Sequence, residues 1–279
     1  MIFQRLIWAA LVTAAVVGSL QTAVQRWQAA PLILAAEVYE AHQAGLAQPD
    51  AALTAHAHAE GEAAHGHDHG AAQEWQPENG AERTGWTWVA NVLHAFSMAL
   101  LVFAVMGAWY CQRVAHRLGV GALLRMAGLV AAAGWLSFHL WPSLGLHAEV
   151  PGMEAAPLHA RQIWWVLAVG GASGASAVAG FARSPWRWLV AAALLALPFV
   201  VGAPQLAGDA LAGFGPEAHA ALEQLSAQFI RAPTWLALSF WVSMGLVGGL
   251  AFKRWVAPSI CAALPGANAI APSALGSVG

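Results

Sequence analysis

Six apolar runs of roughly 20 residues each constrain this chain more than any other feature of its sequence. A helix of about 20 residues crosses the hydrocarbon core of a bilayer, because each residue adds about 1.5 Å. The runs show no regular alternation of polar and apolar residues, which argues against a barrel. The sequence therefore predicts an all-α, polytopic helical membrane protein that sits in a lipid bilayer. The expected spans lie at residues 3–22, 86–110, 122–141, 163–182, 186–203 and 235–252, within one transmembrane domain over residues 1–258.

The first run admits a second interpretation. Arg5 precedes an apolar stretch and small residues follow at Ala29 and Ala30, which is the order of a secretory signal peptide. The run is long for a signal peptide, and no clear Ala-x-Ala motif follows it directly, so we expect an uncleaved anchor. Cleavage would leave five transmembrane helices and would change the orientation of none of them.

Composition excludes several classes of function. Only 9% of the residues are charged and 59% are hydrophobic, whereas a soluble domain carries about 25% charged residues. A net charge of −2 gives no argument for nucleic acid as a partner. Two cysteines without a CxxC motif exclude a disulfide scaffold, and the single lysine, Lys253, follows no Walker-type glycine loop. No segment outside the runs is large enough to fold around a catalytic cleft, so we do not expect an enzyme.

The placement of charge predicts the orientation in the membrane. Eight basic residues and no acidic residue fall on one side of the predicted spans, while all fourteen acidic residues fall on the other. Cytoplasmic loops carry the excess of Lys and Arg. The sequence thus predicts a bacterial inner-membrane protein with both termini in the cytoplasm. The basic residues are Arg5, Arg113, Arg117, Arg125, Arg183, Arg187, Lys253 and Arg254.

A histidine-rich segment interrupts the apolar pattern between the first two runs. Residues 43–83 have no helical or strand periodicity, and we expect a disordered periplasmic loop. Imidazole is the commonest protein ligand for late transition metals, so the loop is a candidate for loose metal capture. A merely solvated polar loop is the alternative, and a catalytic zinc site is not expected, because no fixed helix presents three ligands. The candidate ligands are His56, His58, His65, His67 and His69.

Acidic residues stand just before this loop. Pro31 begins a short amphipathic pattern in which Glu37 and Glu40 are three residues apart and share one helix face, with His42 close by. Their predicted position at the mouth of the spans makes all three candidate ligands for an entering metal ion. An ordinary acidic surface helix would show the same spacing.

Two histidines fall inside predicted spans. His94 shares one face of the second span with Asn91, and His139 lies about one turn before Pro142. Ionisable side chains at this depth are costly and usually face a bundle interior or a cavity, which makes both candidates for an ion path. Structural histidines with satisfied hydrogen bonds are the alternative. Further candidate ligands at the outer mouth are His147, Glu149, Glu154 and His159.

Small residues are concentrated in two spans. The pairs Gly170/Gly174 and Gly245/Gly249 have the spacing that lets helix backbones approach closely in lipid. Packing within the chain and a homo-oligomer interface both fit this spacing. The small residues of 259–279 suggest a disordered tail.

Several stretches, taken in order, resemble the CbtA family of proposed bacterial cobalt transporter subunits. They are Pro31–Glu40, Phe138–Leu146, Glu149–Met153, Ala160–Trp165, Leu197-Pro198 and Gly202–Pro204. The resemblance implies an integral membrane protein that moves cobalt, in support of cobalamin synthesis, with a small single-span CbtB subunit that has its own His-rich end. This chain departs from that pattern in carrying its own histidine tract. Its six apolar runs also differ from the five spans usually ascribed to the family.

The sequence therefore predicts a transporter subunit for uptake of a divalent transition metal, most simply cobalt. The ligands alone leave nickel or zinc open, because such N/O sites follow the general affinity order rather than select one metal. Two other functions remain open. One is a membrane metal-binding accessory or sensor protein without transport, and the other is a redox protein holding haem between His94 and His139.

Overall fold

The computed structural model describes residues 2–47, 77–113 and 120–263, and every regular element in those ranges is helical. The fold class predicted from the sequence is thus confirmed. The α-helices are α1 (Ile2–Gln28), α2 (Ala30–Ala47), α4 (Ala81–Arg113), α5 (Val120–Trp135), α6 (Trp141–Ser143), α7 (Leu158–Phe181), α8 (Arg187–Val201), α9 (Pro216–Phe229), α10 (Ala232–Ser243), α11 (Gly249–Ala251) and α12 (Ala257–Ala263). Three π-helical turns, η2 (Leu136–Leu140), η3 (Met244–Gly248) and η4 (Phe252–Val256), are inserted between them.

Five helical stretches are long and apolar enough to cross a membrane. The remaining predicted span, residues 186–203, corresponds to α8, which has 15 residues and is about 22 Å long, against about 30 Å of hydrocarbon. All six predicted runs are therefore helical, and α8 alone falls short of a full crossing. The five long stretches are Ile2–Gln28, Ala81–Gln112, Gly121–Ser143, Leu158–Phe181 and Pro216–Ala263.

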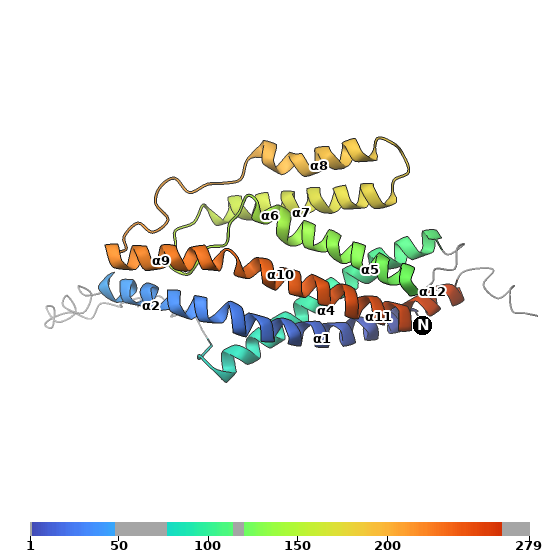
Figure 1. Cartoon of the computed structure of the whole chain (residues 1–279), viewed down its shortest axis with the longest axis horizontal. Helices are drawn as coiled ribbons and strands as arrows, with labels where there is room; N and C mark the ends of the chain where they lie inside the picture. The colour runs from blue at the N-terminus through green and yellow to red at the C-terminus, as the bar shows by residue number, and fades with distance from the viewer. Residues whose placement is uncertain (1, 48–76, 114–119, 264–279) are drawn as a thin grey trace, which may run out of the picture.

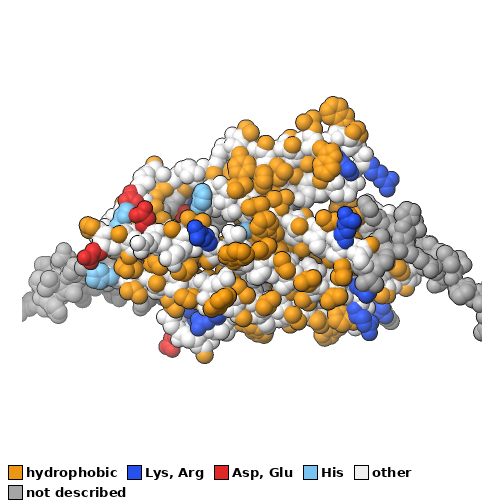
Figure 2. All heavy atoms as spheres, in the orientation of Figure 1, with side chains coloured by type: hydrophobic (Ala, Val, Ile, Leu, Met, Phe, Trp, Pro, Cys, Tyr) orange, Lys and Arg blue, Asp and Glu red, His pale blue; other side chains and the backbone are white. Residues whose placement is uncertain are grey.

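The helices run roughly along the long axis of the molecule and alternate in direction (Figure 1). We call the end formed by α2, the start of α4, residues 144–157 and 202–215, and α9 the acidic end. The described Asp and Glu residues all belong to these segments or, in the case of Glu78, to the residues just before α4, while most Lys and Arg side chains lie toward the opposite, basic end (Figure 2). The separation of charge read from the sequence is thus present in space.

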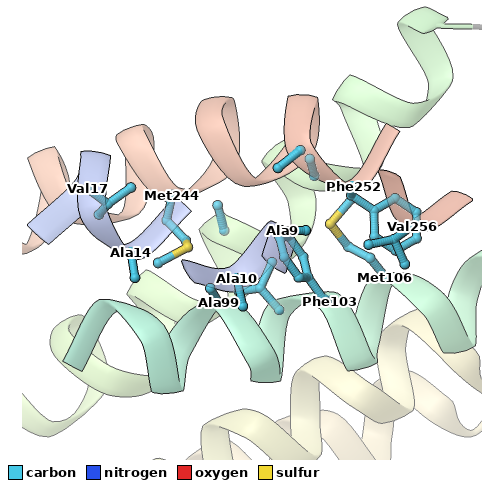
Figure 3. Close-up of a cluster of buried hydrophobic side chains, with 14 of the residues drawn as sticks. Ala9, Ala10, Ala14, Val17, Ala99, Phe103, Met106, Met244, Phe252 and Val256 are labelled. Atoms are coloured by element: carbon cyan, nitrogen blue, oxygen red, sulfur yellow. The ribbon is translucent and has the colours of Figure 1, made fainter. Parts of the chain in front are cut away.

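The main core lies between α1, α4 and the α10–α12 stretch, where buried alanines let the helices pack closely (Figure 3). Phe103 of α4 packs against Phe252 at a ring distance of 6.1 Å, and both side chains are almost fully buried. Gly18 lies against the backbone of Val92, so that a Cβ at this position would be 2.7 Å from the Val92 Cα. Glycine is therefore required for the contact between α1 and α4.

The glycines of the sixth predicted span pack within the chain. A Cβ on Gly245 would lie 2.9 Å from the Ala131 Cβ, and one on Gly249 would lie 2.7 Å from the Ala127 Cβ. Both glycines thus bring the long C-terminal helix against α5. In the fourth span, Gly170 has open space around it, and a Cβ there would meet nothing within 4 Å.

Helices α7 and α8 form a hairpin at the edge of the bundle (Figure 1). Pro198 inside α8 lacks an N–H, which leaves the carbonyl of Leu194 without its usual helical donor. Gly171 of α7 lies so close to this carbonyl that a Cβ would be 2.6 Å from the oxygen. The indole of Trp164 donates to the Pro198 carbonyl at 2.9 Å and ties the two helices together.

The acidic end has a small core of its own, which we call the cap. Ala36 of α2 and Leu222 of α9 are fully buried against Val150 and Leu211 from the two connecting segments. Two stretches that carry the family resemblance, Pro31–Glu40 and Glu149–Met153, therefore meet in the cap. The side chains packed around this core are Tyr39, Met153, Phe214, Leu225 and Phe229.

The structure corrects several predicted boundaries. Helix α9 was not expected, yet residues 216–263 form one helical stretch. The ends of the predicted 43–83 loop are helical, because α2 extends to Ala47 and α4 begins at Ala81, while residues 48–76 lie outside the described ranges. The first five residues of the predicted 259–279 tail are also helical, since α12 extends to Ala263.

Candidate functional site

The Glu37 carboxylate forms an ion pair with Arg83, which joins α2 to the first turn of α4. Arg83 Nη1 donates to Oε2 at 3.0 Å and Nη2 donates to Oε1, so both carboxylate oxygens are engaged. The hydrogen bonds from Arg83 hold the pKa of Glu37 below its ordinary value. A metal ion could use this carboxylate only by displacing the guanidinium.

The other two candidates on α2 do not converge on Glu37. Glu40 is exposed and lies beside Gly152, where an added Cβ would be 3.5 Å from the Glu40 Cβ. His42 is also exposed. The shared helix face predicted for the two glutamates exists, but each one meets a different neighbour.

Two more polar pairs stabilise the acidic end. Glu149 forms an ion pair with Arg161, with Oε2 2.9 Å from Nη2, and Asp209 pairs with His219 Nε2 at 3.0 Å. The backbone N–H of Leu211, followed by His219, lowers the pKa of Asp209. The remaining outer candidates, His147, Glu154 and His159, are exposed side chains without a shared partner among the described residues.

The Asp209–His219 pair was missed by the sequence interpretation. His219 lies in the first turns of α9, and that helix had a recognisable start in Pro216 at its first position and Glu217 in its first turn. Recognising α9 would have placed His219 within reach of the preceding segment.

His94 lies where α4 meets α10. Its ring is 5.1 Å from the Phe240 ring, and part of the imidazole remains accessible. Asn91, one turn closer to the acidic end on the same face of α4, donates from Nδ2 to Thr22 Oγ1 and Gln25 Oε1, both at 3.0 Å. His94 thus lies one helical turn farther from the acidic end than a polar contact between α1 and α4.

His139 belongs to η2, a π-helical turn, and such turns are frequent at functional sites. Its Nε2 is 3.3 Å from Thr234 Oγ1 of α10, and its ring lies 6.1 Å from the Trp135 ring. One imidazole nitrogen is therefore close to a hydroxyl that can either donate or accept.

The two histidines contact different faces of α10. Thr234 and Phe240 are six residues apart, which places them about 120° apart around a helix. Trp241, seven residues after Thr234, stacks on Phe138 at 6.0 Å and confirms that α5 and η2 cover the Thr234 face. Because these two contacts lie about 120° apart around α10 and about 9 Å apart along it, the arrangement gives no support to one haem held between His94 and His139.

The described ranges contain neither a cavity lined by metal ligands nor a cluster of such ligands elsewhere. A cavity of about 630 Å³ between α4, α5, α7 and α8 is lined mainly by apolar side chains and by Ser137, Ser173 and Ser176. Within residues 2–47, 77–113 and 120–263, no three His, Cys, Asp or Glu side chains are grouped closely enough to hold a metal ion. The tract histidines His56, His58, His65, His67 and His69 lie outside these ranges.

Comparison with known proteins gives one match. Neither the curated proteins nor the solved structures contain a match to the chain. The profile of the CbtA family, described as "Probable cobalt transporter subunit", matches residues 3–253 and so covers most of the chain. The long apolar helices agree with a multi-pass membrane protein of that kind. On this match, the chain belongs to the CbtA family.

Proposed function

We propose that this chain conducts divalent cobalt across a bacterial inner membrane, from its acidic end on the periplasmic side to its basic end in the cytoplasm. The observation that carries the proposal is the separation of charge along the bundle axis. Acidic and histidine side chains concentrate cations at one end, and the excess of Lys and Arg at the other is typical of a cytoplasmic face. The family description supplies cobalt as the ion.

The histidine tract acts first in this scheme. Its imidazoles bind metal ions and raise their local concentration, and the carboxylates and imidazoles of the acidic end then receive the ion. His94 follows deeper in the bundle, and His139 lies on the other side of α10. Nickel and zinc would use the same ligand types, so selectivity for cobalt depends on geometry rather than on ligand identity.

The membrane potential is a sufficient source of energy. Moving one charge across 100 mV releases about 2.3 kcal/mol, so a divalent cation gains about 4.6 kcal/mol. At about 1.4 kcal/mol per factor of ten, this supports a gradient of roughly three decades. A separate ATPase is therefore unnecessary on energetic grounds. We further propose that the imported cobalt serves cobalamin synthesis.

Uptake of radiolabelled Co²⁺ tests the proposal. Cells that express His94→Ala should accumulate cobalt much more slowly than cells with the wild-type chain. His116→Ala is the histidine control, because His116 is not among the candidate ligands. His139→Ala, tested in parallel, shows whether the second face of α10 also takes part. Wild-type uptake by both the His94 and the His139 variant would remove the two histidines from the path.

A membrane accessory protein that binds metal without transporting it is the second candidate. The word "subunit" in the family description favours it, because a subunit can serve a partner that forms the path. Vesicles reconstituted with this chain alone separate the two functions. Potential-driven entry of Co²⁺ supports a permease, and its absence, with entry restored by a small CbtB-type partner, supports the accessory role.

A further inference from the structure

Four amide side chains lie together where α1 meets α4 and α10. Gln21, Gln25 and Gln28 recur at helical spacing on one face of α1, and Asn91 faces them from α4. Asn91 donates to Gln25 Oε1 at 3.0 Å, and Ser239 of α10 donates to Gln21 Oε1 at 3.3 Å. We call Gln21, Gln25, Gln28 and Asn91 the amide cluster.

Gln28 differs from the other members of the cluster. Its Oε1 is buried, and among the described residues it is the one buried side-chain oxygen without a hydrogen-bond partner. An unsatisfied buried acceptor is unfavourable, because burial removes it from water without giving it a donor. A carbonyl oxygen in this situation indicates that a donor or a cation completes its environment.

The cluster has spare coordinating capacity for a cation. Gln25 Oε1 and Thr22 Oγ1 each accept one hydrogen bond from Asn91, and an oxygen acceptor has a second lone pair. Asn91 uses its Nδ2 in these contacts, and its Oδ1 takes no part in them. Amide oxygens are ligands for divalent cations that keep part of their water.

The position of the cluster fits a step between capture and the deeper histidine. Gln28 ends α1 on the side of the acidic end, close in sequence to the Glu37–Arg83 pair. Asn91 is one turn from His94 along α4, a rise of about 4.5 Å. An ion that leaves the cap would therefore meet amide oxygens before it meets imidazole.

We propose that the amide cluster is a transient binding site for a partly hydrated divalent metal ion, completed by Gln28 Oε1. This inference rests on the proposed function, because it names a site on the same path. Neutral oxygen ligands suit the role, since a conducting site has to bind an ion strongly enough to admit it and weakly enough to release it.

Hydrogen bonding between helices is the competing explanation of buried amides in a membrane protein. It accounts for Gln21, Gln25 and Asn91, each of which bonds to another helix, but not for Gln28. The two explanations therefore predict opposite outcomes at one position. Removal of an unpaired oxygen should leave packing intact, whereas removal of an ion ligand should weaken metal binding.

The test compares the full-length wild type with Gln28→Leu and with Gln228→Leu, which changes an exposed glutamine on α9. Mn²⁺ is the first probe, because it favours oxygen ligands and binds imidazole most weakly in the affinity series. Electron paramagnetic resonance counts the Mn²⁺ bound by purified protein. Gln28→Leu should bind Mn²⁺ about tenfold more weakly at this site, with a thermal midpoint equal to or above that of the wild type, and Gln228→Leu should match the wild type.

Entry of Co²⁺ into vesicles, measured on the same three proteins, separates this inference from the proposed function. A half-saturating Co²⁺ concentration about tenfold higher for Gln28→Leu supports both. If no protein carries Co²⁺ while Mn²⁺ binding still depends on Gln28, the proposed function fails and the site stands. If Gln28→Leu keeps wild-type Mn²⁺ affinity, or if the wild type binds no Mn²⁺ that depends on Gln28, the site is overturned.

Discussion

The contact between Gly18 and Val92 makes a quantitative prediction about the bundle. In Gly18→Ala, the new Cβ would be 2.7 Å from the Val92 Cα and 2.8 Å from its N, both backbone atoms that no rotamer change can move. Ordinary carbon contacts begin near 3.4 Å, so α1 and α4 would have to separate by about 0.7 Å. A gap of this size forfeits a quarter to a half of each affected contact.

The same separation weakens the polar contact one turn away. The hydrogen bonds from Asn91 to Thr22 and Gln25 are 3.0 Å long, and a displacement of about 0.7 Å would stretch them beyond the usual limit. Overpacking costs typically about 1–3 kcal/mol, against a gain of up to about 1 kcal/mol in helix propensity. We expect Gly18→Ala to lower stability by about 1–3 kcal/mol, and the thermal midpoint by about 2–12 °C at roughly 2–4 °C per kcal/mol.

Thermal unfolding of purified protein in detergent, followed by size-exclusion chromatography, measures this effect. Gly170→Ala and Gly128→Ala are matched controls, because a Cβ at either helical position meets nothing within 4 Å. Both controls should unfold at or slightly above the wild-type midpoint. A Gly18→Ala midpoint as high as those of the controls would refute the argument that backbone approach requires glycine there.

Three further predictions concern the acidic end. Leu222→Ala empties part of the fully buried cap core, so it should cost about 2–5 kcal/mol and speed protease cleavage within 202–215. Arg83 lowers the pKa of Glu37, so the ion pair stabilises the fold at any pH above the ordinary pKa of a glutamate. This stabilisation is lost as the pH falls through the pKa that Glu37 has in the folded protein. The thermal midpoints of wild type and Glu37→Gln should therefore differ at pH 7 and converge as the pH falls below the ordinary pKa of a glutamate. Deletion of residues 50–72 should raise the Co²⁺ concentration needed for half-maximal uptake and leave the maximal rate largely intact.

Run length and apolarity were enough to predict the helices. Each of the six apolar runs is helical, because in lipid the backbone has to satisfy its own hydrogen bonds. The separation of charge was also readable, since Asp, Glu, Lys and Arg cannot easily lie between two interfaces. Helix α9 was missed because its polar residues give no transmembrane signal.

Contacts between side chains were much harder to predict. Arg83 pairs with Glu37 across 46 positions of sequence, most of them in a segment without periodicity. His94 and His139 looked like members of one path, yet they contact different faces of α10. The length and apolarity of a run indicate which residues are helical. They do not indicate which helices become neighbours, because lipid is as apolar as the helix surfaces themselves.

The 48-residue stretch from Pro216 to Ala263 belongs to both cores of the molecule. Leu222 is buried in the cap and Phe240 in the main core, and Ile230 and Arg231 between them keep right-handed helical backbone angles. Loss or gain of one residue between Leu222 and Phe240 would turn one core about 100° relative to the other. Insertions and deletions in this stretch should therefore be far less tolerated than substitutions, so its length is under stronger constraint than its composition.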